Sequence, residues 1–458
     1  MPATLECRSA RSKESSSLKV KLLHWVAVVF AFALLSLRLL RIAKLYSVNV
    51  FMADQWKFNE AALFEKHSLW QVFRWQHGPH RQGVGGLLAA LIEPLFRWNS
   101  RYEAFLAVVI VVIAALLALY LKMRLHGILR VEDIVIPLFF LTPVQYESLV
   151  AGTNLSHGPL PLLLVIGYCL CWTINSLPWR YVGIVGANFL LIYTGFGLLM
   201  GFITPILLAI DWHRNSENSA WRGLAFVGSL ISLVSFFIGY HFQPAAECFS
   251  AKPTNPIYYA LFASFMYAAF VGVRASHALV PAILLGSAFL LALISALGLS
   301  FRKALSVASA DQLVRVALLS YGVLFSLATA YGRFCLGLGA AMGSRYMSYI
   351  VLGFFGLYLA VVSCQEKVLH AVSLSVVVAL ALLTGARVNH HDRLALETLH
   401  SGRAAWRACY ISYNDLQQCK SRTNFEVYAP GADQELSSKL DFLRHNRLNL
   451  YADAGAKP

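Results

Sequence analysis

The feature that most constrains this chain is a series of apolar runs of about 18 or more residues that carry few charges. An α-helix of that length crosses the hydrocarbon core of a bilayer. The runs do not alternate between apolar and polar residues, which disfavours a transmembrane β-barrel. Hydrophobic residues make up 58% of the 458 positions, far above an ordinary soluble domain. The sequence therefore predicts an all-α polytopic membrane protein.

The apolar runs and the positions of Lys and Arg predict about eleven transmembrane helices, with the N-terminus in the cytoplasm. The basic, Ser-rich residues 1–21 form a cytoplasmic tail, and the first apolar run lacks a small-residue cleavage site, so it is expected to stay in the chain. The multi-span domain covers 22–386, and the polar residues 387–458 form a small outward cap. The expected spans are about 22–44, 103–122, 132–148, 157–175, 181–194, 197–211, 221–240, one within 257–300, 312–331, 346–363 and 367–386.

Two segments do not read as simple spans. Residues 45–100 are too polar to cross the membrane, and their four tryptophans are typical of amphipathic helices lying in the outer interface. Residues 257–300 could hold either an outward or re-entrant helix followed by one span, or two spans. The basic residues of "FRK" at 301–303 favour the first arrangement because they are expected in the cytoplasm.

Charge and cysteine usage narrow the partners and the compartment. The formal net charge of +15 fits basic cytoplasmic loops and anionic lipid headgroups, and the absence of a clustered basic face disfavours nucleic acid. The eight cysteines contain no CxxC pair. Cys409 and Cys419 share the polar tail and could form a disulfide if that tail faces an oxidising compartment.

Four polar clusters fall on the outward side in this topology, where ionisable groups at membrane depth are candidates for function. In the first, Asp54-Gln55-Trp56, the carboxylate could cap a helix or act as a general base. In the second, "QHGPHRQG" at 76–83, a metal site is disfavoured because no further ligand completes it. The alternatives there are an interfacial anchor or contact with a phosphate, for which the following "GVGG" could open a helix N-terminus.

The third and fourth clusters lie later in the chain. Gln145, Glu147, Asn154 and His157 interrupt an apolar stretch and could bind sugar hydroxyls or join helices by polar contacts; Glu147 could also be the base or a metal ligand. Arg333 and Arg345 flank a glycine-rich loop and could bind a phosphate or extend to the interface. Tyr346 could stack on a sugar. The candidate contacts are Asp54 as base; His77, His80, Arg81, Arg333 and Arg345 toward phosphate; and Trp56, Gln76, Gln145, Glu147, Asn154, His157 and Tyr346 toward sugar or acceptor.

The order of these motifs resembles the GT-C superfamily of membrane glycosyltransferases, and more narrowly a bacterial branch of it. The resemblance rests on "DQW" at 54–56, "QHGPHR" at 76–81, "PVQYE" at 143–147 with Asn154, and "GR" at 332–333 with "SRY" at 344–346. It spans most of residues 20–350. Two departures stand out: "GP" occupies the place of "NE" in the second motif, and Ser148 stands where Asn is expected after Glu147.

The resemblance implies a sugar transfer on the periplasmic face of the bacterial inner membrane. A polyprenyl-phosphate-linked sugar is the implied donor, and a glycan, a lipid or a surface protein such as a pilin is the acceptor. Asp54 takes the acceptor's proton, and the arginines and histidines stabilise the leaving phosphate. The residues identify no cofactor, and a divalent metal is possible but disfavoured. The alternative function is a transporter or flippase of a lipid-linked or anionic solute, and a polymerase or ligase would share the donor chemistry.

Overall fold

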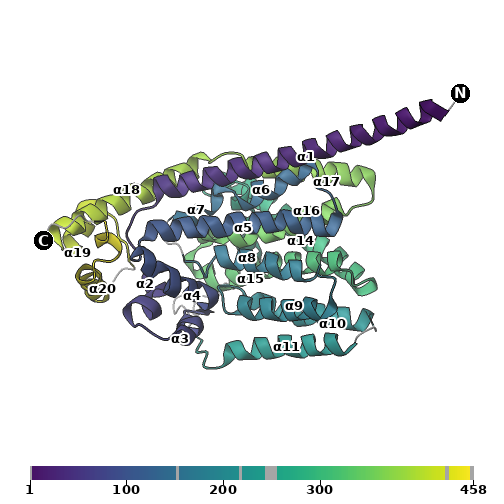
Figure 1. Cartoon of the computed structure of the whole chain (residues 1–458). Helices are drawn as coiled ribbons and strands as arrows, with labels where there is room; N and C mark the ends of the chain where they lie inside the picture. The colour runs from purple at the N-terminus through teal and green to yellow at the C-terminus, as the bar shows by residue number, and fades with distance from the viewer. Residues whose placement is uncertain (1–2, 151–153, 216–218, 243–254, 429–432, 454–458) are drawn as a thin grey trace.

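The computed structural model describes residues 3–150, 154–215, 219–242, 255–428 and 433–453. Helices dominate, and most of them run side by side in one bundle (Figure 1). Within the described ranges, eight helices are long and apolar enough to cross a membrane. The chain is an all-α, membrane-embedded protein, as the apolar runs predict.

The bundle helices follow the expected spans closely. The first, α1 (Ala3–Tyr46), continues N-terminally beyond the predicted span, and the shortest are α6 and α8. The others begin and end within a few residues of the predicted limits, apart from α14, which falls in the ambiguous segment. The set is α5 (Ser100–His126), α6 (Val135–Phe140), α8 (Pro159–Cys171), α9 (Leu177–Ile192), α10 (Leu198–Arg214), α11 (Ser219–Phe237), α14 (Leu279–Ser306), α15 (Ala310–Arg333), α16 (Met347–Val362) and α17 (Lys367–Gly385).

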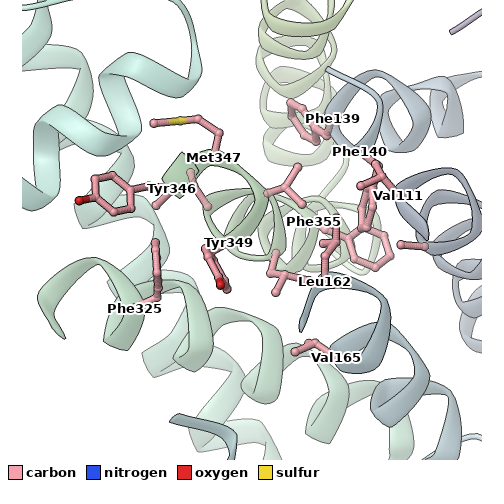
Figure 2. Packing of buried hydrophobic residues seen from close by; sticks show 14 of the residues in the cluster. Val111, Phe139, Phe140, Leu162, Val165, Phe325, Tyr346, Met347, Tyr349 and Phe355 are labelled. Carbon is pink, nitrogen blue, oxygen red and sulfur yellow. The ribbon is translucent and has the colours of Figure 1, made fainter. Parts of the chain in front are cut away.

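The bundle is apolar both inside and outside, as a bilayer requires. Large apolar side chains such as Phe30, Leu116 and Leu291 are exposed on its surface, where lipid chains would cover them. Inside, α16 carries aromatic residues on several faces (Figure 2). Tyr349 stacks on Phe325 with ring centroids 4.5 Å apart, and this contact lies beside Tyr346 at the polar end of the bundle.

Residues 45–100 form a compact layer of short elements at that end of the bundle (Figure 1). Trp70 is exposed, as an interfacial residue would be, but Trp56 and Trp98 are buried, so the interfacial role predicted for all four tryptophans is wrong for these two. The Trp56 ring packs against Phe51 and against Tyr428 of the C-terminal tail. The elements are α2 (Gln55–Phe58), η1 (Glu60–Phe64), α3 (Leu69–Arg74), β1 (Gln76–His77), β2 (His80–Arg81), α4 (Gly83–Ile92) and η2 (Glu93–Phe96).

The ambiguous segment 257–300 contains one short and one long helix. The short helix α13 (Ile257–Phe270) has only 14 residues, whereas α14 has 28. Near its start, Tyr259 contacts Tyr331 and Phe334 at the end of α15. Just beyond its end, Arg274 pairs with Asp392 at the start of α18. Both ends of α13 therefore contact the polar end of the bundle, which agrees with the favoured arrangement of an outward helix followed by one span.

The tail forms a helical cap over the layer of residues 45–100 (Figure 1). It consists of α18 (His390–Tyr413), α19 (Leu416–Thr423), α20 (Asp433–His445) and η8 (Asn449–Tyr451), and a Cys409–Cys419 disulfide joins α18 to α19. The Val427 carbonyl accepts hydrogen bonds from the Ala53 N–H, at 2.9 Å, and from the Trp56 indole, at 3.1 Å. The cap therefore holds the segment that carries Asp54.

We expect Asn449→Ala to release this cap. The fully buried Asn449 side chain accepts from the Phe51 N–H and donates to the Trp98 carbonyl and the Ser100 hydroxyl. Truncation leaves these buried groups unpaired, which costs about 1–3 kcal/mol per group. The thermal unfolding midpoint in detergent should fall and the cap should become sensitive to protease. Asn446→Ala is the control, because Asn446 is exposed and donates only to Phe442; equal midpoints for the two variants would contradict the expectation.

Candidate functional site

Asp54 lies exposed at the start of α2 with its carboxylate uncommitted. Ala53, the residue before it, has a left-handed backbone (φ 50°), a strained conformation for a residue with a Cβ. Asp54 occupies the N-cap position, but its side chain accepts no capping hydrogen bond. Its Oδ1 instead lies 3.9 Å from Nε2 of His77, and 54% of the side chain is exposed. The geometry therefore argues against the helix-cap interpretation of this carboxylate.

A two-stranded hairpin brings His77 and His80 to the site. In this hairpin His77 pairs with His80 across the strands, and Gly78 takes the positive φ that the tight turn requires. The Gln76 amide donates to the carbonyls of Gly78 and His241 and its oxygen accepts from the His241 N–H. Gln76 thus fixes the hairpin to the segment after α11 rather than facing a ligand.

His157 completes a group of three imidazoles. Its ring centroid lies 4.9 Å from that of His80 and 6.4 Å from that of His77. The Phe196 N–H donates to Nδ1 of His80 at 3.4 Å, and the Asn154 amide lies 3.3 Å from Nδ1 of His157. Because the Asn154 oxygen already accepts from the Ser156 N–H, its amide nitrogen is the group facing His157. In both rings the proton is therefore placed on Nε2.

Burial keeps these imidazoles uncharged at neutral pH. It lowers the pKa of His77, where the Asp54 carboxylate opposes the effect. It lowers the pKa of His80 well below the ordinary value, with His157 adding to the decrease. It lowers the pKa of His157 to about 4, with His77 adding to the decrease. Within the described residues, the buried Nε2 of His157 has no hydrogen-bond partner. His80 and His157 are thus neutral, with the N–H donor of each ring on Nε2.

Two arginines supply fixed positive charge. Arg333 ends α15 and is near enough to lower the pKa of both His77 and His80. No carboxylate among the described residues forms an ion pair with Arg333. Arg345 lies with Nη1 3.7 Å from Oε1 of Glu147, and its backbone N–H donates to Oε2 of Glu147 at 3.3 Å. Arg333 is therefore the cation most free to bind an anion, whereas Glu147 orients Arg345.

Three predicted ligand contacts have structural roles instead. Arg81 is buried, and its guanidinium donates to the carbonyls of Phe236, Ile238 and Arg74. Trp56 is fully buried with its N–H on Val427, and Gln145 is buried with its amide on the Phe140 carbonyl at 2.6 Å. Because other protein groups already bind these side chains, the predictions of Arg81 as a phosphate contact and of Trp56 and Gln145 as sugar contacts are wrong. The same holds for Gln76, which is bound to His241.

The glycines of "GVGG" also serve packing. They do open α4, as expected, but a Cβ at Gly85 would lie 2.1 Å from the Ser156 hydroxyl, and one at Gly83 would lie 2.2 Å from the Tyr193 carbonyl. The start of α4 is therefore covered by protein, and the phosphate predicted at this helix N-terminus has no room. These glycines bring the hairpin close to the loop that carries His157.

The other predicted residues lie around the imidazoles. Tyr346 is buried below Arg345, whose guanidinium carbon lies 5.5 Å from the centre of the Tyr346 ring, and the Tyr346 hydroxyl has no partner among the described residues. Phe196, Gly195 and Tyr349 belong to no polar cluster in the sequence and were not predicted. The Tyr349 hydroxyl accepts from the Gly158 N–H and donates to the Gly195 carbonyl, which fixes the loops on both sides of His157. In the described ranges, no three His, Cys, Asp or Glu side chains gather as metal ligands.

The low pKa of His157 predicts a loss of stability in acid. Its pKa is about 4 in the folded protein and about 6.5 in an unfolded chain. Between these values the unfolded state binds more protons, so stability falls as the pH decreases from about 6.5 to about 4. We expect the thermal midpoint to fall less over this range in His157→Gln than in the wild type. His213→Gln, at an exposed position, should follow the wild type; identical profiles for all three proteins would contradict the expectation.

No protein-family model matches the chain, and the comparison with curated proteins gives no match. The assignment of function therefore rests on the geometry of the site.

Proposed function

We propose that the chain is a GT-C-type glycosyltransferase that moves a sugar from a polyprenyl-phosphate donor to an acceptor on the outer face of the bacterial inner membrane. One observation supports this proposal most strongly. Asp54, with a carboxylate that caps no helix, lies beside His77 at one end of a membrane-embedded bundle, near two further imidazoles and Arg333. These residues come from four segments that are far apart in the sequence.

The proposed reaction uses each group once. The Asp54 carboxylate takes the proton of an acceptor hydroxyl, whose oxygen bonds to the anomeric carbon of the donor sugar. The bond between that carbon and the phosphate oxygen breaks, and polyprenyl phosphate leaves as an anion. Arg333, Arg345 and the Nε2–H groups of His80 and His157 stabilise this charge as it develops. A single direct displacement inverts the anomeric centre.

The disulfide arrangement supports the orientation of the site. Cys409 and Cys419 are joined in the cap, on the side of the bundle that carries Asp54. Free Cys171 ends α8 and free Cys364 follows α16, at the opposite ends of helices that begin near the site. Disulfides persist in oxidising compartments such as the periplasm. This distribution favours a periplasmic site.

The test is a transfer assay with the purified protein in lipid nanodiscs. A polyprenyl-phosphate donor with a radiolabelled sugar is supplied together with an extract of bacterial envelope lipids and glycans. We expect the labelled acceptor and free polyprenyl phosphate to form in equal amounts. Movement of the intact labelled lipid across a sealed vesicle bilayer, without cleavage, would overturn the proposal and favour the transporter alternative.

A further inference from the structure

A cavity adjoins the Asp54 site. It has a volume of about 570 Å³ and lies between α18, the segment joining α13 to α14, and α7 (Tyr146–Val150). Ala53, the neighbour of Asp54, and Glu147, the partner of Arg345, both line it. His77, His80, His157 and Arg333 are not among its lining residues. The cavity, which we name the Arg274 pocket, is therefore separate from the imidazole group but shares a wall with it.

Arg274, His277 and His391 form the polar part of the lining of the Arg274 pocket, together with Glu147. Nη2 of Arg274 donates to Oδ1 of Asp392 at 2.8 Å, and Asp392 is fully buried beneath it, so the carboxylate holds the guanidinium in place while part of the arginine stays exposed. The rings of His277 and His391 stack with centroids 4.3 Å apart. Glu147 is the one acidic residue in the lining, and Arg345 already engages it.

Apolar side chains of α18, the helix that also carries His391, complete the lining. They are Leu394, Ala395 and Leu399, and Leu394 is 53% exposed. The preceding helix α17 exposes Val372, Val376 and Leu383 on the bundle surface, where lipid chains would lie. Figure 1 shows α18 continuing from α17 past the end of the bundle. A ligand with an acyl chain and a charged headgroup matches the polar and the apolar parts of this lining.

We propose that the Arg274 pocket binds the phosphate-bearing headgroup of a membrane lipid and that this lipid is the sugar acceptor. Arg274, His277 and His391 hold the phosphate, and the apolar residues Leu394, Ala395 and Leu399 hold the start of the acyl chain. A headgroup hydroxyl then reaches Asp54 past Ala53. This inference rests on the proposed glycosyl transfer and specifies its acceptor as an anionic lipid.

Lipid binding tests the pocket without any need for transfer. Native mass spectrometry counts dioleoyl phosphatidic acid bound to the purified full chain, in competition with dioleoyl phosphatidylcholine. We expect the wild type to prefer phosphatidic acid. Its affinity for this lipid should be at least about tenfold lower in Arg274→Gln, because a charge-assisted contact is lost. The affinity should not change in Arg393→Gln, since Arg393 is an exposed residue of α18 outside the lining. Because Arg274→Gln leaves buried Asp392 without its arginine, His277→Gln, at an exposed residue, serves as a second variant with a smaller decrease expected.

Three results would contradict the proposal that the Arg274 pocket binds an anionic lipid. These are equal binding of both lipids, unchanged affinity in the Arg274 and His277 variants, and displacement of phosphatidic acid by soluble glycerol 3-phosphate at equal concentration. The last result would show that the phosphate alone is recognised and that the ligand is not a lipid.

The transfer assay separates this inference from the proposed function. With a phosphorylated lipid as acceptor, we expect His277→Gln to raise the KM for the acceptor and leave the KM for the donor unchanged. If His277→Gln transfers sugar with an unaltered KM for the acceptor, the Arg274 pocket is not the acceptor site, and the proposed function is unaffected. Selective lipid binding without transfer to any acceptor would remove the proposed function and leave only an anionic-lipid site.

Discussion

Asp54→Asn is expected to lower the turnover of sugar transfer about 10²–10⁴-fold, the usual contribution of a general base. The amide has nearly the shape of the carboxylate but cannot take a proton from the acceptor hydroxyl. The fold should survive, because the Asp54 side chain is 54% exposed and caps no helix. The transfer assay in nanodiscs measures the rate, and the thermal midpoint of the same preparation reports the fold.

Glu65→Gln is the matched control for this variant. Glu65 is an exposed acidic residue of the same outward layer, paired with His67. The Glu65→Gln protein should transfer sugar at the wild-type rate. A well-folded Asp54→Asn protein with unchanged turnover would remove Asp54 as the base.

Arg333→Gln is expected to lower turnover about 10²–10³-fold, which is typical for the loss of one group that stabilises charge in a transition state. Among the described residues no carboxylate forms an ion pair with Arg333, and Arg333 lowers the pKa of His77, the imidazole beside Asp54. Glutamine leaves the departing phosphate with neutral donors alone. Arg333→Lys should recover part of the rate, because the charge returns without the two-pronged geometry of the guanidinium.

The control for Arg333→Gln is Arg302→Gln. Arg302 is exposed near the opposite end of the bundle, so this variant should transfer sugar at the wild-type rate. Turnover and the KM for the donor are measured for all four proteins. An Arg333→Gln protein with wild-type values for both would contradict the phosphate-binding role.

The sequence predicts the fold of this chain more fully than its site. Bilayer thickness sets the length of each apolar run, so the spans can be recognised one at a time from local composition. The placement of Lys and Arg then puts Asp54, His77, His157 and Arg345 on one side, where the structure brings them together. The number of eleven spans stays a prediction, because several of the helices are shorter than a typical span.

The role of each polar side chain was harder to predict, because it depends on neighbours that are distant in the sequence. Arg81 and His80 are adjacent and look alike as phosphate contacts, but Phe236, 155 positions away, supplies the carbonyl that occupies Arg81. Trp56 is likewise satisfied by Val427 in the cap. Arg274 was overlooked for the same reason, since its partner Asp392 lies 118 positions later.

The most direct test of the central claim is chemical rescue of Asp54→Ala, in which added formate takes the place of the missing carboxylate. Transfer by this variant in nanodiscs is measured in sodium formate and in sodium chloride of equal ionic strength. If the Asp54 carboxylate is the base, the variant is nearly inactive in chloride and formate raises its rate at least about tenfold, with saturation. Wild-type activity without formate, or equal rates of the folded variant in the two salts, would contradict the account.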